Sequence, residues 1–238
     1  EAGAGEEANG ENGTVEGGGV TARGDAGQRL LRALAPDVVA IQEWVPESGT
    51  YQDFVTANFG AGYSYVVDGT TGANAIPNGI ISRWPILETN IWDDAYVGYR
   101  EHIHARIDLP GPKDLNLVSV HFDAADAADR ANEAIALTNY IATENFGSSN
   151  YLAIAGDLNL PDRTTEPVLT TLGTIVSDAD QPTTKAGSKN TNPAETAPYD
   201  YVLPDAALEA TAQTVYCNGT SFADGMLFDT REWGDHQY

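Results

Sequence analysis

The chain has 238 residues, of which 35 are acidic and 12 basic, so its net charge at pH 7 is −23. This length fits one large domain, and no Pro/Ser-rich linker or charge block divides the middle of the chain. Such an acidic surface repels polyanions at low salt, which excludes non-specific nucleic-acid binding unless cations or screening assist. The charge is typical of adaptation to a salty environment, with a cation-binding surface or an acid-tolerant secreted protein as alternatives.

The composition also bears on location. No apolar stretch approaches the roughly 18 to 20 residues that cross a bilayer, so we expect no membrane span. The N-terminus has no basic-then-apolar signal pattern. The single cysteine, Cys217, excludes an internal disulfide. We therefore expect a soluble protein that is extracellular or secreted, and its acidic charge fits a high-salt environment.

The amino-acid composition of the chain changes near residue 25. Residues 1–24 are rich in Gly, Glu, Asn and Ala, which predicts a flexible or loosely packed N-terminal segment. Residues 25–238 are expected to form a single domain. It begins with an amphipathic helix over 25–36, a buried strand over 37–43 and a second helix over 49–60.

Strands are expected to dominate the middle of the chain, and residues 102–109 show the clearest alternation of apolar and polar residues. The longest predicted helix covers 124–145, with Ile135, Thr138 and Ile141 along one face. A short helix is expected around 165–172, before a polar loop over 178–198. The other predicted strands are 63–67, 78–83, 86–92, 115–121, 151–156, 199–204, 212–217 and 225–230. This order predicts two sheets packed face to face with helices on the outer faces.

Ionisable and amide side chains stand at the ends of several predicted strands. Each one alone is more typical of a turn, a helix cap or a hydrogen-bonded structural histidine. Their joint occurrence is far less expected by chance. The residues are Glu43, His121, Asp157, Asn159, Asp200, Asp235 and His236.

Hydrolysis of a phosphate ester requires side chains of these types. A hard divalent cation takes carboxylate and amide oxygens, and Glu43, Asp157, Asn159 and Asp235 are ligands of that kind. The attacking water must also lose a proton, and a histidine held by a carboxylate is the usual device. His236 with Asp200, and His121 with a further acid, would supply two such pairs.

Six ordered motifs resemble the endonuclease/exonuclease/phosphatase superfamily, which includes pancreatic deoxyribonuclease and neutral sphingomyelinases. They are "PDVVAIQE", "NGIISRWPI", "SVHFD", "GDLN", "YDYVL" and "GDH", and the resemblance spans roughly residues 25–238. It implies an α+β fold of the deoxyribonuclease type. This is a four-layer α/β/β/α sandwich of two mixed sheets and flanking helices, with the site at one rim.

The resemblance also assigns roles to the histidines and their partners. It implies that His121 and His236 are the catalytic histidines and that Asp200 orients His236. Glu101, in "YREHIHARI", is the positional candidate for the glutamate that supports His121 in the deoxyribonuclease-like branch.

The remaining roles concern water, phosphate and metal. Asp157 is expected to help hold the attacking water, and Asn159 to contact the substrate phosphate. Glu43 and Asp235 would hold the divalent metal, for which Mg²⁺ is the first choice and Mn²⁺ or Ca²⁺ the alternatives.

The chain departs from the family pattern at both ends. Family members begin with a strand that ends in an asparagine, and nothing in residues 1–24 resembles it. The chain also stops two residues after His236, where the family continues into a last sheet strand. We therefore expect a domain without these two strands, either as part of a longer protein or completed by strands donated from another chain.

The combined pattern predicts a metal-dependent phosphodiester hydrolase, with a nuclease acting on DNA or RNA as the first hypothesis. A phosphatase or phosphodiesterase acting on lipid, sugar or other small phosphate esters is the alternative, and a non-catalytic assembly subunit is the third. The nuclease hypothesis lacks a basic groove. Five arginines lie near the motifs, and we expect them to be surface ion-pair partners: Arg83, Arg100, Arg106, Arg130 and Arg163.

Overall fold

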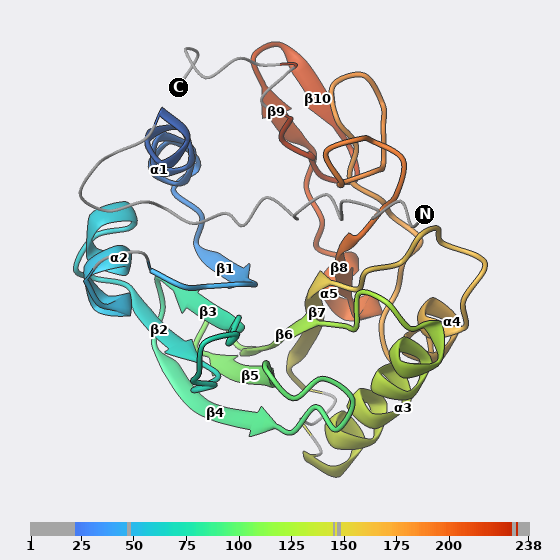
Figure 1. The fold of residues 1–238 in the computed structure, drawn as a ribbon. Helices are drawn as coiled ribbons and strands as arrows, with labels where there is room; N and C mark the ends of the chain where they lie inside the picture. The colour runs from blue at the N-terminus through green and yellow to red at the C-terminus, as the bar shows by residue number, and fades with distance from the viewer. Residues whose placement is uncertain (1–21, 47–48, 145, 147–148, 230–231, 233–238) are drawn as a thin grey trace, which may run out of the picture.

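The computed structural model describes residues 22–46, 49–144, 146, 149–229 and 232. Most of the predicted N-terminal segment, and the predicted site residues Asp235 and His236, lie outside the described residues. The described chain forms two packed β-sheets with helices on both outer faces (Figure 1). The predicted four-layer α+β sandwich is confirmed.

The two sheets differ in size and in strand direction. The smaller sheet is antiparallel throughout, in the order β1-β3-β2, whereas two mixed sheets were expected. Its strands are β1 (Val38–Ile41), β2 (Ser64–Val67) and β3 (Gly79–Ser82). The larger sheet runs in the order β4-β5-β6-β7-β8, and only its β6–β7 pair is parallel. Its strands are β4 (Ile86–Trp92), β5 (His102–Ile107), β6 (Leu115–His121), β7 (Tyr151–Asp157) and β8 (Asp200–Pro204).

Helices cover the outer faces of the sandwich (Figure 1). The smaller sheet carries α1 (Ala22–Leu34) and α2 (Tyr51–Asn58), and the larger sheet carries α3 (Ala127–Glu144) and α4 (Val168–Leu172). Helix α3 makes the crossover that parallel pairing of β6 and β7 requires. A short helix α5 (Ala206–Glu209) follows β8, and the chain then forms a hairpin of β9 (Val215–Cys217) and β10 (Thr220–Phe222).

The apolar core has three layers. Between the sheets, Ile80 of β3 packs with Ile103, Leu117 and Ala153 of the larger sheet. The other two layers lie under α3 and α4, and between α2 and the smaller sheet. In the last of these, a Cβ at Gly79 would overlap the Trp44 ring, so the "NGIIS" glycine makes room for a buried tryptophan.

The buried face of α3 shares Ile141 with the predicted one but not Ile135. Its buried residues are Arg130, Glu133, Ala134, Leu137 and Ile141, whereas Ile135 is 51% exposed. The buried stripe keeps helical spacing but contains two charged residues. A face chosen by its apolar residues alone is therefore displaced by one position.

The C-terminal strands also differ from expectation. The predicted strand 225–230 is absent from its described part, residues 225–229, where Met226 forms only an isolated bridge with Thr183. The second hairpin strand lies earlier, at Thr220–Phe222, and pairs with β9. No described helix is long and apolar enough to span a bilayer.

Strand β1 has one open edge within the described part of the chain, because it pairs with β3 alone. A hollow of about 350 Å³ lies beside it, over the inner face of β6, β7 and β8. Its lining includes Ala40, Leu117, Ala155 and Val202, and is mainly apolar. The idea that another chain donates a strand to the sandwich stays a prediction.

Candidate active site

Three predicted site residues lie side by side at one end of the larger sheet. The parallel pairing of β6 and β7 sets His121 opposite Asp157, and the antiparallel pairing of β7 and β8 sets Asp157 opposite Asp200. Directly opposed residues of neighbouring strands project from the same face of a sheet. Strand register therefore assembles a row of histidine, aspartate and aspartate from three distant parts of the sequence.

Glu43 reaches this row from the other sheet. It follows the end of β1 and adopts a left-handed backbone, with φ of 52°. Its Oε1 lies 4.0 Å from His121 Nε2, and Asp157 Oδ2 lies 3.7 Å from the same nitrogen. These distances exceed hydrogen-bond length. Two carboxylates thus converge on one imidazole without being bonded to it.

The "GDLN" loop is built by backbone constraints as well as by side chains. Gly156 has φ of 146°, and a Cβ there would overlap the carbonyl oxygen of Val120. Beyond it, Asp157 Oδ1 accepts a hydrogen bond of 2.7 Å from the backbone N–H of Asn159, whose φ is 50°. This is the local turn that an aspartate two residues earlier stabilises. The loop therefore both turns the chain and presents side chains. Two predicted site residues, Glu43 and Asn159, are among the non-glycine residues with positive φ.

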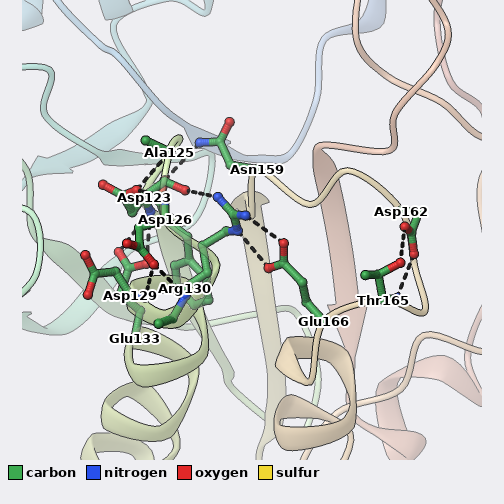
Figure 2. Close-up of polar contacts among 12 residues, drawn as sticks. Asp123, Ala125, Asp126, Asp129, Arg130, Glu133, Asn159, Asp162, Thr165 and Glu166 are labelled. Atoms are coloured by element: carbon green, nitrogen blue, oxygen red, sulfur yellow. Dashed lines mark hydrogen bonds and ion pairs between the residues drawn. The ribbon is translucent and has the colours of Figure 1, made fainter.

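Asn159 uses its amide nitrogen inside the protein. Its Nδ2 donates a hydrogen bond of 2.9 Å to the carbonyl oxygen of Phe122. The amide oxygen is consequently the outer end of the side chain, and Figure 2 shows it turned away from Asp123 and Arg130. The predicted contact of Asn159 with a phosphate stays a prediction.

Burial dominates the electrostatics of the row. Burial, with a smaller effect of Arg100, lowers the pKa of His121 to about 3, so the imidazole is neutral at pH 7. Burial, and next the charge of Asp200, raises the pKa of Asp157 to about 7. A cation placed among these carboxylates would favour their ionised forms.

The donor set fits a hard divalent cation. Carboxylate oxygens of Glu43 and Asp157 converge, and the Asn159 amide presents an oxygen of the kind such ions bind. Within the described ranges, no group of three His, Cys, Asp or Glu side chains is arranged to hold a metal. The second predicted ligand, Asp235, lies outside those ranges, as does His236.

Glu101 does not make the predicted contact with His121. Its Oε2 accepts a hydrogen bond of 2.7 Å from the backbone N–H of Asp94. His121 Nδ1 is buried and has no hydrogen-bond partner among the described residues. The supporting role assigned to Glu101 by its position in the motif is therefore not seen in the structure.

Two of the five arginines are not the surface ion-pair partners we expected. Arg100 is 2% exposed and Arg130 is 5% exposed. The other three do form partly exposed ion pairs with carboxylates: Arg83, Arg106 and Arg163. Arg100, two residues before β5, donates hydrogen bonds to the backbone carbonyls of His121 and Phe122. Sequence reasoning missed its role, because an arginine beside a strand end carries no local signal of burial.

Comparison with known proteins gives an independent indication of the fold and the family. The chain is similar in structure to sphingomyelinase C from Streptomyces griseocarneus, with 19% identity and a TM-score of 0.60 over 83% of this chain and 88% of that one. It is similar to D. rerio TDP2 complexed with a single-strand DNA product, with 19% identity and a TM-score of 0.55 over 81% and 82%.

A third similar structure is beta toxin from Staphylococcus aureus, with 16% identity and a TM-score of 0.56 over 83% of this chain and 89% of that one. At such identities these likenesses show the shared fold alone. No curated protein sequence matches the chain significantly. The sequence model of the Endonuclease/Exonuclease/phosphatase family matches residues 17–224. This chain belongs to the endonuclease/exonuclease/phosphatase family, whose membership indicates a phosphoesterase.

Proposed function

We propose that this protein is a divalent-metal-dependent phosphodiester hydrolase whose substrate is DNA or RNA. The observation that carries the proposal is the row of His121, Asp157 and Asp200 across three strands, with Glu43 facing it from the other sheet. A structural turn or cap needs one carboxylate, and not several converging on a neutral histidine. TDP2, which shares this fold, was determined in complex with a single-strand DNA product, so the fold can carry a nucleic-acid substrate.

The residues divide the chemistry between them. Glu43, with Asp235, would hold Mg²⁺, which when bound polarises a phosphoryl oxygen and offsets developing negative charge. Neutral His121 can donate its N–H to a phosphoryl oxygen or to the leaving group. Asp157, set between His121 and Asp200, is suited to hold the attacking water. Asp200 would orient His236, which activates that water.

A lipid or other small phosphodiester is the second candidate, and the ion pairs favour it. Arg83, Arg106, Arg130 and Arg163 are each within ion-pair distance of a carboxylate. They are therefore poorly available to a polyanionic backbone. The similarity to sphingomyelinase C agrees with this alternative.

The test is hydrolysis of plasmid DNA, single-stranded RNA, sphingomyelin vesicles, bis-p-nitrophenyl phosphate and a phosphomonoester. Each is assayed with Mg²⁺ and with EDTA, at low and at molar salt. We expect diester cleavage that EDTA abolishes and that His121→Ala lowers by about 100-fold or more. The matched control is His104→Ala, which removes another buried histidine of the same sheet, hydrogen-bonded to Asn116 and away from the row.

The outcomes separate the hypotheses. Cleavage of sphingomyelin but not of nucleic acids would show that the substrate is a lipid and not DNA or RNA. Cleavage of monoesters alone would show that the protein is a phosphatase and not a phosphodiesterase. Activity that survives both EDTA and His121→Ala would refute the mechanism. A folded wild-type protein that cleaves none of these substrates would leave the non-catalytic assembly subunit as the better hypothesis.

A further inference from the structure

Arg100 is a buried cation next to the candidate site. Its side chain is 2% exposed. Its Nε donates a hydrogen bond of 2.6 Å to the carbonyl oxygen of His121, and its Nη2 donates one of 2.5 Å to that of Phe122. Both bonds go to consecutive backbone carbonyls. Burying a guanidinium is costly, so such a residue needs strong local bonding or a functional reason.

The two carbonyls belong to the turn that ends β6. Phe122 also donates its backbone N–H to the carbonyl oxygen of Asp157, at 2.9 Å, which continues the pairing of β6 with β7 past the last strand residues. The planar fork of an arginine fits two neighbouring acceptors in a way that a lysine ammonium cannot. Arg100 therefore clamps the backbone that carries His121.

The carbonyl oxygen of Phe122 has a second donor. It accepts from Asn159 Nδ2 at 2.9 Å as well as from Arg100 Nη2. A carbonyl oxygen has two lone pairs, so these two bonds use its full acceptor capacity. The position of this one atom thus couples Arg100 to the orientation of the Asn159 amide.

We propose that Arg100 is a positioning residue for the reaction, acting through the Phe122 carbonyl on Asn159. This inference rests on the proposed function above. Because Asn159 Nδ2 is held by Phe122, Asn159 Oδ1 is the free end of the amide and is turned away from Asp123 and Arg130 (Figure 2). Asn159 then presents Oδ1 as an acceptor toward a water, a hydroxyl group or the cation, while one of its two side-chain N–H groups is held by Phe122.

A kinetic double-mutant cycle tests the coupling. Arg100→Met and Arg100→Lys are each combined with Asn159→Ala, and kcat and KM are measured on bis-p-nitrophenyl phosphate with Mg²⁺. We expect Arg100→Met to lower kcat by about 100-fold while KM changes by less than about threefold, because misplacement by an ångström acts on the transition state. Arg100→Lys, which keeps the charge and loses the fork, should recover part of this loss.

The decisive comparison is the double variant. If Arg100 acts through Asn159, Arg100→Met in the Asn159→Ala background should lower kcat by less than about threefold further. Multiplicative losses would overturn the proposal. Arg106→Lys, an arginine of β5 whose ion pairs with Glu88 and Asp114 are partly exposed, is the matched control. If Arg100→Met does not fold, the same cycle is run with Arg100→Lys.

A spectroscopic measurement decides the link without activity. In ¹⁵N-labelled protein, the Asn159 side-chain amide signals are assigned by their loss in Asn159→Ala. We expect them to move and to exchange faster with solvent in Arg100→Lys, and to stay unchanged in Arg106→Lys. Unchanged Asn159 signals in Arg100→Lys would refute the coupling. Failure of the wild type to cleave any phosphodiester would instead refute the proposed function, and the two results are independent.

Discussion

Two regions of the molecule treat buried charge differently: the contact between α3 and the segment before α4, and the candidate site. In the first, Arg130 forms a bidentate pair with Glu166, with bonds of 2.8 and 2.6 Å, and also donates to the carbonyl oxygen of Asp123 (Figure 2). At the site, carboxylates converge with no such partner and His121 Nδ1 is left without one in the described structure. Paired charge is typical of structural support, and unpaired charge of a site that a ligand completes. By this criterion the charges of Arg130 and Glu166 stabilise the fold, and the carboxylates of the candidate site serve the chemistry.

The largest expected effect comes from removing the Arg130–Glu166 ion pair. Arg130→Met leaves the buried carboxylate of Glu166 without its partner, which should lower the free energy of unfolding by about 3–5 kcal/mol. Urea denaturation measures this change. The double variant Arg130→Met/Glu166→Leu should recover much of the loss, since no unpaired charge remains. A double variant as unstable as the single one would contradict this account of the pair.

The next largest effect is expected from a substitution of Asp157 in the candidate site. Asp157→Asn should lower kcat by about 100-fold, equivalent to about 2.7 kcal/mol. The same change should leave the melting temperature at pH 8 unchanged or higher. The reason is that the raised folded-state pKa of Asp157 contributes stability below the unfolded pKa, and this is lost as pH rises through about 7.

Asp162→Asn is the matched control in the same loop. Its carboxylate accepts bonds from the backbone N–H groups of Thr164 and Thr165, and these bonds, with that of the Thr165 hydroxyl, hold the pKa of Asp162 well below its usual range. Stability from a depressed pKa is present above the unfolded pKa, so at pH 8 this variant should melt lower and keep its activity. The reverse pattern in the two aspartate variants would remove the distinction between structural and chemical carboxylates.

The last expected effect concerns Glu133, a buried residue of α3 one turn after Arg130. It is fully buried, and both its carboxyl oxygens accept from the backbone N–H of Asp123, at 3.1 and 2.9 Å. Burial, and next the neighbouring Asp94 carboxyl, raises the pKa of Glu133 to about 9. Its contribution to stability is therefore complete below the unfolded pKa and is lost as pH rises toward about 9.

Glu133→Gln imitates the protonated side chain and should remove this dependence. Melting temperatures of both proteins at pH 5, 7 and 9 provide the measurement. We expect the melting temperature of the variant to fall less than that of the wild type between pH 5 and 9. Parallel melting curves across this range would show that Glu133 is ionised in the folded protein.

Sequence reasoning located elements well where local patterns are strong. The buried strands ending near His121 and Asp157 were confirmed, because a run of β-branched and apolar residues bounded by polar ones is a local property. The pattern also indicated that Glu43 and Asp200 flank strands, which the structure confirms. Their approach to one another could only be inferred from family resemblance.

Other features needed the three-dimensional arrangement. The buried face of α3 was misplaced because it includes Arg130, whose partner Glu166 is 36 residues away in sequence. The predicted support of His121 by Glu101 gave way to a backbone partner at Asp94. The clamp by Arg100 spans 21 and 22 residues to its two carbonyls. No local periodicity reports such pairings.

By itself, therefore, the sequence determined the alternation of strands and helices, the acidic character and the polar residues that end the strands, since these follow from side-chain type and spacing. The tertiary structure decided which of those residues meet. Strand register set His121, Asp157 and Asp200 in one row, and the turn after β6 gave Arg100 and Asn159 a shared carbonyl. The physical reason is that burial and hydrogen-bond partners depend on contacts between distant segments, which residue order does not encode locally.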